Sequence, residues 1–158
     1  MSTAPSRVAD ELTRLGITVT IVTLPASTRT AAEAADAVRC SVAQIAKSLV
    51  FRAAGSDRPV LVIASGANRV DTSLLEGRLG EPVRRADPDW VRETTGFAIG
   101  GIPPVAHRVQ PVVFMDEDLL ALGDVWAAAG TPNSVFRVAA AELARVTGAV
   151  VMRTAQHG

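Results

Sequence analysis

Lys47 is the residue in this chain whose type and setting best suit chemistry, and it is the only lysine among 158 residues. It lies in the segment QIAKSLVF, between a short predicted helix and an apolar strand. Strand alternation places Lys47 on the same face as Leu49 and Phe51, so its aliphatic stem runs along apolar surface. A partly desolvated ammonium can stabilise developing negative charge or position a substrate carbonyl. From spacing alone, a lysine that merely extends from a strand edge into water stays an open alternative.

A glycine- and proline-rich segment, GFAIGGIPP at residues 96–104, is the second candidate. Its composition excludes a helix or a central strand and predicts a structured loop. Gly100 and Gly101 let the backbone approach a ligand and expose amide N–H groups, which suits an oxyanion or a carbonyl. A tight connection between a helix and the next strand is the alternative. A phosphate-cradling loop is disfavoured because the Gly-Lys-Ser/Thr ending of the Walker pattern is absent.

Further small and polar residues could line a cleft beside these two candidates. The segment SGAN follows an apolar strand, GTPN ends the segment VWAAAGTPN, and one histidine follows the glycine-rich loop. Both tetrapeptides suit either the wall of a cleft or a plain turn. The resulting candidates for substrate binding are Ser65, Gly66, Asn68, Pro104, His107, Gly130 and Asn133.

Neither a metal site nor a protein nucleophile is predicted. His107 and Cys40 alone cannot build a zinc site, and no Cys, His or Asp spacing in the chain resembles one. Ser65, Ser73 and Cys40 all lack the Gly-x-Ser-x-Gly turn or another recognisable nucleophile context. We therefore expect no metal and no cofactor.

The elements that must position these residues alternate between helices and strands. Helical spacing and capping signals predict helices, some of them short, at 6–15, 31–39, 40–46, 70–79, 87–94, 118–122 and 139–146. Strands are predicted at 19–24, 47–52, 59–64, 110–115, 125–129, 135–138 and 149–152. The strands 47–52 and 59–64 are spaced for a hairpin. This pattern predicts an α+β (mixed α/β) fold in one domain, residues 1–158 with a core at about 6–152, built on a curved sheet.

Composition limits the classes of partner. The chain is 48% apolar but only 4% aromatic, so Ala, Val, Leu and Ile must build the core. Sixteen basic and sixteen acidic residues cancel, which argues against a DNA-binding protein while permitting contact with the tip of an RNA. No segment reaches the length of an apolar membrane span, and no secretory signal pattern is present. We expect a cytoplasmic protein with no membrane partner.

Taken together, these segments resemble the YbaK / prolyl-tRNA editing family, aminoacyl-tRNA deacylases whose fold also occurs as the editing insertion of bacterial prolyl-tRNA synthetases. The resemblance covers roughly residues 17–152, and its specific parts are the lysine in its helix-to-strand setting and a Gly-x-x-x-Pro loop that maps to Gly100 and Pro104. It implies a mixed sheet, partly closed into a barrel-like shape and flanked by helices, with a cleft for an aminoacyl group. The matching stretches are TRTAAEAADAVRCSVAQIAKSLVF, PVLVIASGANRVD, TGFAIGGIPPVAH, VVFMDEDLL and VWAAAGTPNSVFRVAAAELARVTGA.

The resemblance also implies an activity, namely hydrolysis of the ester that joins a mischarged amino acid to the 3′ end of a tRNA of the proline set. A free hydroxyl of the terminal ribose and a water would act in place of a side-chain nucleophile. Lys47 would hold the carbonyl or the terminal phosphate, and Gly100 and Gly101 would position the ester. The implied partners are the acceptor end of an aminoacyl-tRNA and an aminoacyl-tRNA synthetase. Many relatives have Gly where this chain has Ala106, so the flexibility of the loop differs.

Two alternatives stay open at this point. A non-catalytic binding module of the same fold, associated with tRNA or a synthetase, fits the neutral net charge. A hydrolase of some other ester is weakened by the missing nucleophile.

Overall fold

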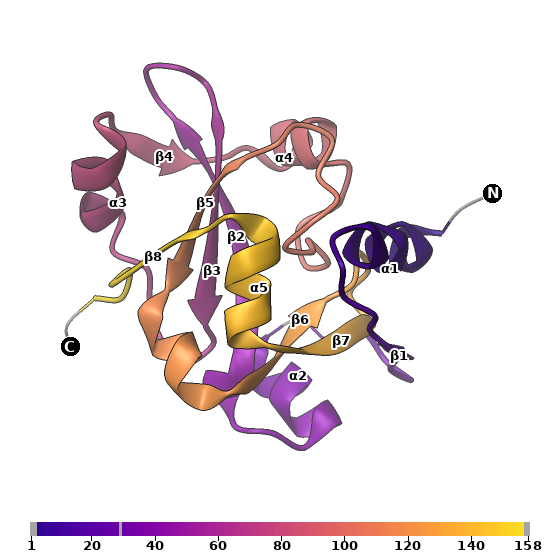
Figure 1. Cartoon of the computed structure of the whole chain (residues 1–158). Helices are drawn as coiled ribbons and strands as arrows, with labels where there is room; N and C mark the ends of the chain where they lie inside the picture. Colours follow the sequence, from indigo (N-terminus) through magenta and orange to yellow (C-terminus); the bar gives the residue numbers. More distant parts are fainter. Residues whose placement is uncertain (1–2, 29, 157–158) are drawn as a thin grey trace.

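Eight strands form one mixed sheet, and the helices lie against it (Figure 1). The computed structural model describes residues 3–28 and 30–156. Along the sheet the strands follow the order β1 (Ile21–Thr23), β7 (Ser134–Ala139), β6 (Asp124–Ala128), β2 (Ile45–Ala53), β3 (Pro59–Ser65), β5 (Val112–Asp116) and β8 (Val150–Met152), and β4 (Val83–Arg85) pairs with β2. β1 and β8 end this path without pairing with each other. The mixed α/β fold is confirmed, but the sheet is open and not closed into a barrel.

The helices carry the end signals that the sequence contains. They are α1 (Ala4–Arg14), α2 (Ala31–Val38), α3 (Thr72–Leu79), α4 (Pro88–Thr95) and α5 (Ala140–Thr147), with 3₁₀ turns η1 (Val42–Gln44) and η2 (Glu117–Leu122). The Thr30 hydroxyl accepts a hydrogen bond from the Glu33 amide at 3.1 Å, which caps α2. Gly80 and Gly96 end α3 and α4 in the left-handed conformation. No described helix has the length and apolarity needed to cross a membrane.

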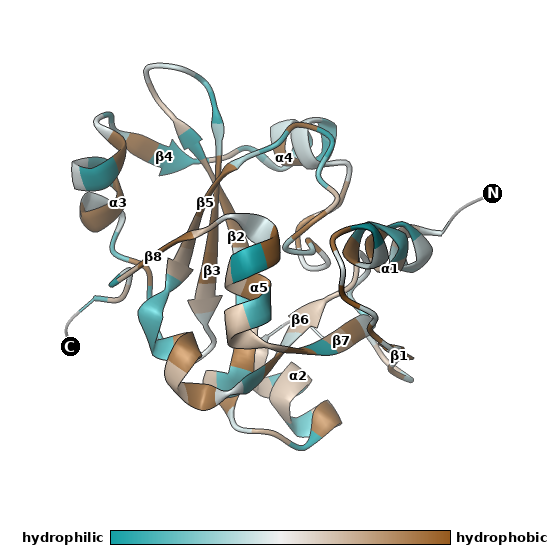
Figure 2. Cartoon of the chain, in the orientation of Figure 1, coloured by the Kyte–Doolittle hydropathy of each residue, from teal (hydrophilic) through white to brown (hydrophobic). Residues whose placement is uncertain are grey.

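The core lies on both faces of the sheet because β3 is buried on both sides. Leu61 and Ile63 belong to the larger core beneath α1 and α5, whereas Val60 and Val62 pack into a smaller one with Leu75 of α3. Burial on both faces explains the uninterrupted apolar run of this strand. In Figure 2 the central strands are mainly hydrophobic, while hydrophilic residues lie on the helices and at the tip of the β2–β3 hairpin.

The predicted hairpin is confirmed, since β2 and β3 pair antiparallel along their length. The predicted helix at 40–46 is wrong in its second half, because Ile45 and Ala46 already belong to β2 and pair with β6. Only the short turn η1 remains helical. Strand β4 was not predicted from the sequence, and β1 is shorter than expected.

Candidate active site

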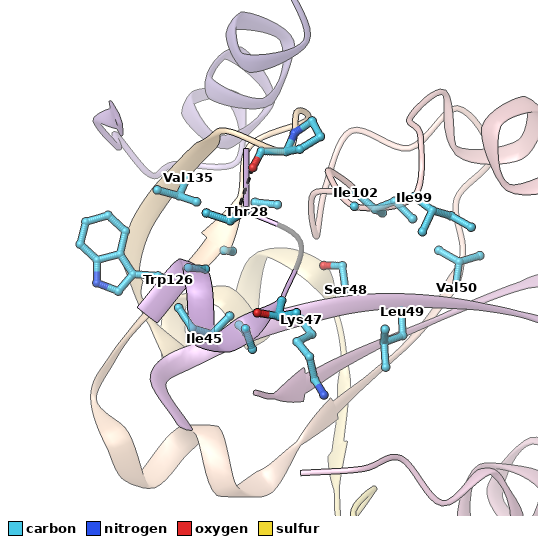
Figure 3. Close-up of a pocket in the computed structure, with 18 of the residues that line it drawn as sticks. Thr28, Ile45, Lys47, Ser48, Leu49, Val50, Ile99, Ile102, Trp126 and Val135 are labelled. Atoms are coloured by element: carbon cyan, nitrogen blue, oxygen red, sulfur yellow. Dashed lines mark hydrogen bonds between the residues drawn. The ribbon is translucent and has the colours of Figure 1, made fainter. Parts of the chain in front are cut away.

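A cavity of about 500 Å³ lies beside β2, bounded by β6, α2 and the loop of residues 96–104 (Figure 3). Lys47 and Gly100, from the two leading sequence candidates, both line it. Most of the remaining wall is apolar, including Ile45, Ile102 and Trp126. The volume is in the range of sites that hold small organic ligands.

The cavity occupies a gap in the sheet. One edge of β2 pairs with β3 throughout, whereas its other edge pairs with β6 only at Ile45 and Ala46 and with β4 only at Phe51–Ala53. Between these pairings, no described strand covers this edge of β2 at residues 47–50, and all four residues line the cavity. Main-chain groups of the sheet therefore form part of the cavity wall.

Neighbouring side chains of β2 point to opposite sides of this gap. Lys47 and Leu49 leave the strand on one side, and Ser48 and Val50 leave it on the other, toward Ile99 of the glycine-rich loop (Figure 3). The prediction that Lys47 and Leu49 share one face of the strand is therefore confirmed. The Ser48 hydroxyl is buried and has no hydrogen-bond partner among the described residues.

The Lys47 ammonium is half-buried and is held by main chain. Its Nζ donates a hydrogen bond to the carbonyl oxygen of Asn68 at 2.9 Å. Burial lowers the pKa of Lys47; the negative charge of Asp116 opposes that shift and the positive charge of Arg69 adds to it. An ammonium has three donors, so this contact leaves two of them for a ligand.

Behind Lys47, a buried carboxylate organises the turn that presents the Asn68 carbonyl. Asp116, which is 1% exposed, accepts hydrogen bonds through Oδ2 from Asn68 Nδ2 at 2.8 Å and from the Ser65 amide at 3.2 Å. Asn68 Nδ2 also donates to Asp118 at 2.8 Å, and the Ser65 hydroxyl donates to the Ala43 carbonyl at 2.8 Å. Ser65 and Asn68 therefore support Lys47 and do not line the cavity. Asp116 was missed, and its only sequence signal is a lone carboxylate at the end of an apolar strand.

The glycine-rich loop approaches the cavity through its backbone. Gly100 has φ of +101°, a conformation that disfavours residues with a side chain. A Cβ on Gly101 would lie 2.7 Å from backbone atoms of Thr131, so the loop packs directly on the turn after β6. In that turn the Thr131 hydroxyl donates to Asn133 Oδ1 at 2.9 Å. The turn adds Thr131 and Pro132 to the cavity wall, whereas Gly130 and Asn133 lie behind it.

Two other predicted residues lie on the far side of this loop. His107 and Pro104 line a separate cavity of about 90 Å³ near Glu11 and Arg14 of α1. The Nε2 atom of His107 is 2.6 Å from the Pro103 carbonyl oxygen. Burial lowers the pKa of His107, an effect partly opposed by this hydrogen bond. The structure thus places His107 where it can support the loop, away from Lys47.

Gly66 lies at the end of β3, where there is no room for a side chain. A Cβ there would lie 2.4 Å from the Val42 carbonyl oxygen, and the Gly66 amide donates to Ile45 at 2.7 Å. This glycine lets η1 and the start of β2 pack against the end of β3. In the described ranges, no three His, Cys, Asp or Glu side chains are grouped as metal ligands.

The sequence and the overall fold both match known proteins. The family model for the aminoacyl-tRNA editing domain matches residues 25–146. The protein YwhH of Bacillus subtilis (strain 168) is 34% identical over 117 residues, which cover 74% of each chain. A structure described as a candidate trans-editing enzyme for prolyl-tRNA synthetase is 46% identical, with a TM-score of 0.92 and coverage of 99% of each chain. A structure from work on grafting linear epitopes onto scaffold proteins is 42% identical, with a TM-score of 0.93 and coverage of 99% of this chain and 100% of that one. Because the match to the family model extends over most of the chain, the chain belongs to the aminoacyl-tRNA editing domain family.

Proposed function

We propose that the protein is a trans-editing hydrolase that releases a mischarged amino acid from tRNA, most directly tRNA(Pro). The observation that carries this proposal is that Lys47 and Gly100, distant in sequence, line one cavity of about 500 Å³. That volume suits an aminoacyl group and part of the terminal ribose. The resemblance of the chain to a candidate trans-editing enzyme for prolyl-tRNA synthetase supports the choice of tRNA.

The cavity favours ester hydrolysis without a protein nucleophile. None of the described residues that line it is a cysteine or a histidine. The Thr28 and Thr131 hydroxyls donate to Pro132 and Asn133 oxygens, and the Ser134 hydroxyl lies against that of Thr131. The Thr30 hydroxyl lies 3.3 Å from a Glu33 carboxylate oxygen but is engaged as the cap of α2, and the Ser48 hydroxyl has no base among its described neighbours. In the proposed reaction a water, oriented by the free hydroxyl of the terminal ribose, attacks the ester carbonyl. The bond from the carbonyl carbon to the ribose oxygen then breaks. That oxygen takes up a proton that the attacking water gives up.

Lys47 and the loop supply the positioning. The two N–H donors of Lys47 that Asn68 does not use are suited to the ester carbonyl or the terminal phosphate. Gly100, which has no side chain, allows the ester to approach its amide, which can stabilise the developing oxyanion, whereas the Gly101 amide donates to the Ala98 carbonyl oxygen. Asn68 and Asp116 fix the position of the ammonium, and His107 supports the loop through Pro103.

The experiment that tests this proposal measures release of amino acid from tRNA(Pro) charged with Ala, Cys, Ser or Pro. We expect release of at least one noncognate amino acid by the wild-type protein and none by Lys47→Ala, which should stay folded because Lys47 is half-buried at the cavity. Binding of charged tRNA without release, at enzyme levels far above substrate, would support a non-catalytic binding module instead. Unfolding of Lys47→Ala would show that this lysine is structural.

A further inference from the structure

We propose that the free edge of β2 is itself a binding site, in which main-chain groups of Ser48 and Val50 hydrogen-bond the aminoacyl part of the substrate. The substrate would then complete the sheet in the gap between β6 and β4. This inference rests on the proposed function and assigns the groups that hold the amino acid.

The pairing register identifies which residues face the gap. In an antiparallel ladder, residues that exchange hydrogen bonds with the partner strand alternate with residues whose N–H and C=O groups point to the opposite edge. Ile45 accepts from the Gly66 amide at 2.7 Å, and Ala53 donates to Arg58 at 3.0 Å, so the odd-numbered residues of β2 bond β3. Ser48 and Val50 therefore direct their N–H and C=O groups away from β3, into the cavity that both residues line.

The length of the gap selects the kind of ligand. β6 pairs with β2 as far as Ala46, and β4 begins to pair at Phe51. Two outward-facing residues span only about 7 Å of strand, at roughly 3.3 Å per residue. An extended polypeptide needs a longer free edge, whereas a single aminoacyl group fits this one. Its α-ammonium can donate to an edge carbonyl, and its acyl oxygen can accept from an edge amide.

A second observation at the same place points to a ligand. The Ser48 hydroxyl is buried without a partner in the part of the chain that the structure describes, which is uncommon for a buried polar atom. Its side chain points toward the side of the gap where Ile99 and Ile102 lie (Figure 3). A ligand lying along the edge between β2 and the loop would contact Ser48 through both its main chain and its hydroxyl.

Amide hydrogen exchange by NMR on the full-length protein tests this inference, with 3′-deoxy-3′-(L-alanylamino)adenosine as a probe that cannot be hydrolysed as an ester. In the free protein we expect the Ser48 and Val50 amides to exchange faster than those of Lys47 and Leu49, which bond β3. Saturating probe should slow exchange at Ser48 and Val50 at least tenfold and leave Lys47 and Leu49 unchanged. The two odd-numbered amides are internal controls.

Exchange at Ser48 and Val50 that stays fast at millimolar probe would overturn the inference, whether the probe binds elsewhere or not at all. Equal protection of all four amides in the free protein would also overturn it, because the edge would then be covered. Deacylation by the wild-type protein is measured separately. If it proceeds while these two amides are unaffected, the free edge is not the binding site and the proposed function stands.

Replacing the Val50 amide by an ester, through incorporation of the matching α-hydroxy acid, removes one edge donor and leaves the side chain in place. We expect KM for alanyl-tRNA(Pro) to rise about tenfold. The same replacement at Val62 of β3, which pairs with Leu49 and lies outside the cavity lining, breaks a bond between β3 and β2, so it should lower the melting temperature and leave KM within about twofold. An equal KM effect at both positions would contradict the assignment.

Discussion

At the scale of single residues, the position and the charge environment of the Lys47 ammonium depend on groups that are distant in sequence. The chain itself predicts the strand that carries this lysine and the apolar face along which its stem runs. It does not predict Asp116, because the contact between Asn68 and Asp116 joins residues 48 positions apart. Alternation along one strand is a local property, whereas the charge environment of the ammonium arises only when β3 and β5 are aligned.

The first prediction concerns that charge environment. Asp116 opposes the burial effect on Lys47, so Asp116→Asn should lower the pKa of Lys47 further. The ammonium would then lose its proton at a lower pH, and the alkaline limb of the deacylation profile should move to lower pH. Because Lys47 is the only lysine, selective labelling of lysine side chains gives a single NMR titration.

Asp118→Asn is the matched control for this titration, since Asp118 also accepts from Asn68 but is more exposed than Asp116. We expect it to change the pKa of Lys47 less than Asp116→Asn does. An unchanged or raised pKa in a folded Asp116→Asn protein would contradict the electrostatic role assigned to Asp116.

The second prediction concerns His107. Its pKa is lowered in the folded state because burial disfavours the imidazolium, so the unfolded chain binds the proton more readily. The free energy of unfolding should therefore fall as pH drops below about 6.5, the ordinary value for histidine. His107→Gln should show a smaller fall between pH 7.5 and 5.5 in urea denaturation. Equal pH dependence in the two proteins would show that His107 titrates normally.

At the scale of elements, the glycine-rich loop and the turn after β6 act as one unit. Gly101→Ala places a Cβ 2.7 Å from the Thr131 backbone, so one of the two segments must move. We expect a loss of about 1–3 kcal/mol in the free energy of unfolding and a marked loss of deacylation. Denaturant unfolding and single-turnover rates measure the two effects.

Gly77→Ala is a control of the same size in a different setting. Gly77 lies in α3, with nothing within 4 Å of its added Cβ. Alanine is favoured in helices, so this variant should gain about 0.5–1 kcal/mol and keep full activity. Destabilisation of both variants to the same extent would show that packing against Thr131 is not the cause.

Elements whose signals are local were predicted well, and those that depend on distant partners were not. The β2–β3 hairpin follows from two apolar strands and the turn between them, and the helix ends follow from residues such as Thr30 and Gly80. The gap beside β2 does not, because it depends on where β6 stops and β4 begins. The misassigned Ile45 and Ala46 have the same cause, since pairing with β6 overrides the helical tendency of the segment.

At the scale of the whole molecule, a net charge of zero limits how the protein can hold RNA. Arg85 lines the cavity, and Arg84 precedes it on the same short strand. Contact with a few phosphates next to the aminoacyl end should therefore supply most of the electrostatic attraction. The dependence of log KM on log salt should be shallow, with a slope of about 1–2.

Arg85→Gln should raise KM for charged tRNA and reduce that slope, with little change in kcat. Arg145→Gln serves as control, because Arg145 lies on α5 outside the cavity lining and pairs with Glu142. Equal effects of the two substitutions on KM would mean that the tRNA strand next to the aminoacylated end does not pass along β4.

The central claim is that this cavity hydrolyses an aminoacyl ester with a water that a hydroxyl of the substrate orients, without a protein nucleophile. The most direct test compares single-turnover release of alanine from tRNA(Pro) ending in adenosine and from the same tRNA ending in 2′-deoxyadenosine, with alanine on the 3′ oxygen in both. Rapid release from the first and release at the uncatalysed rate from the second is the predicted result. Equal catalysed rates on both substrates would contradict the claim, because the protein would then have to orient or activate the attacking group itself.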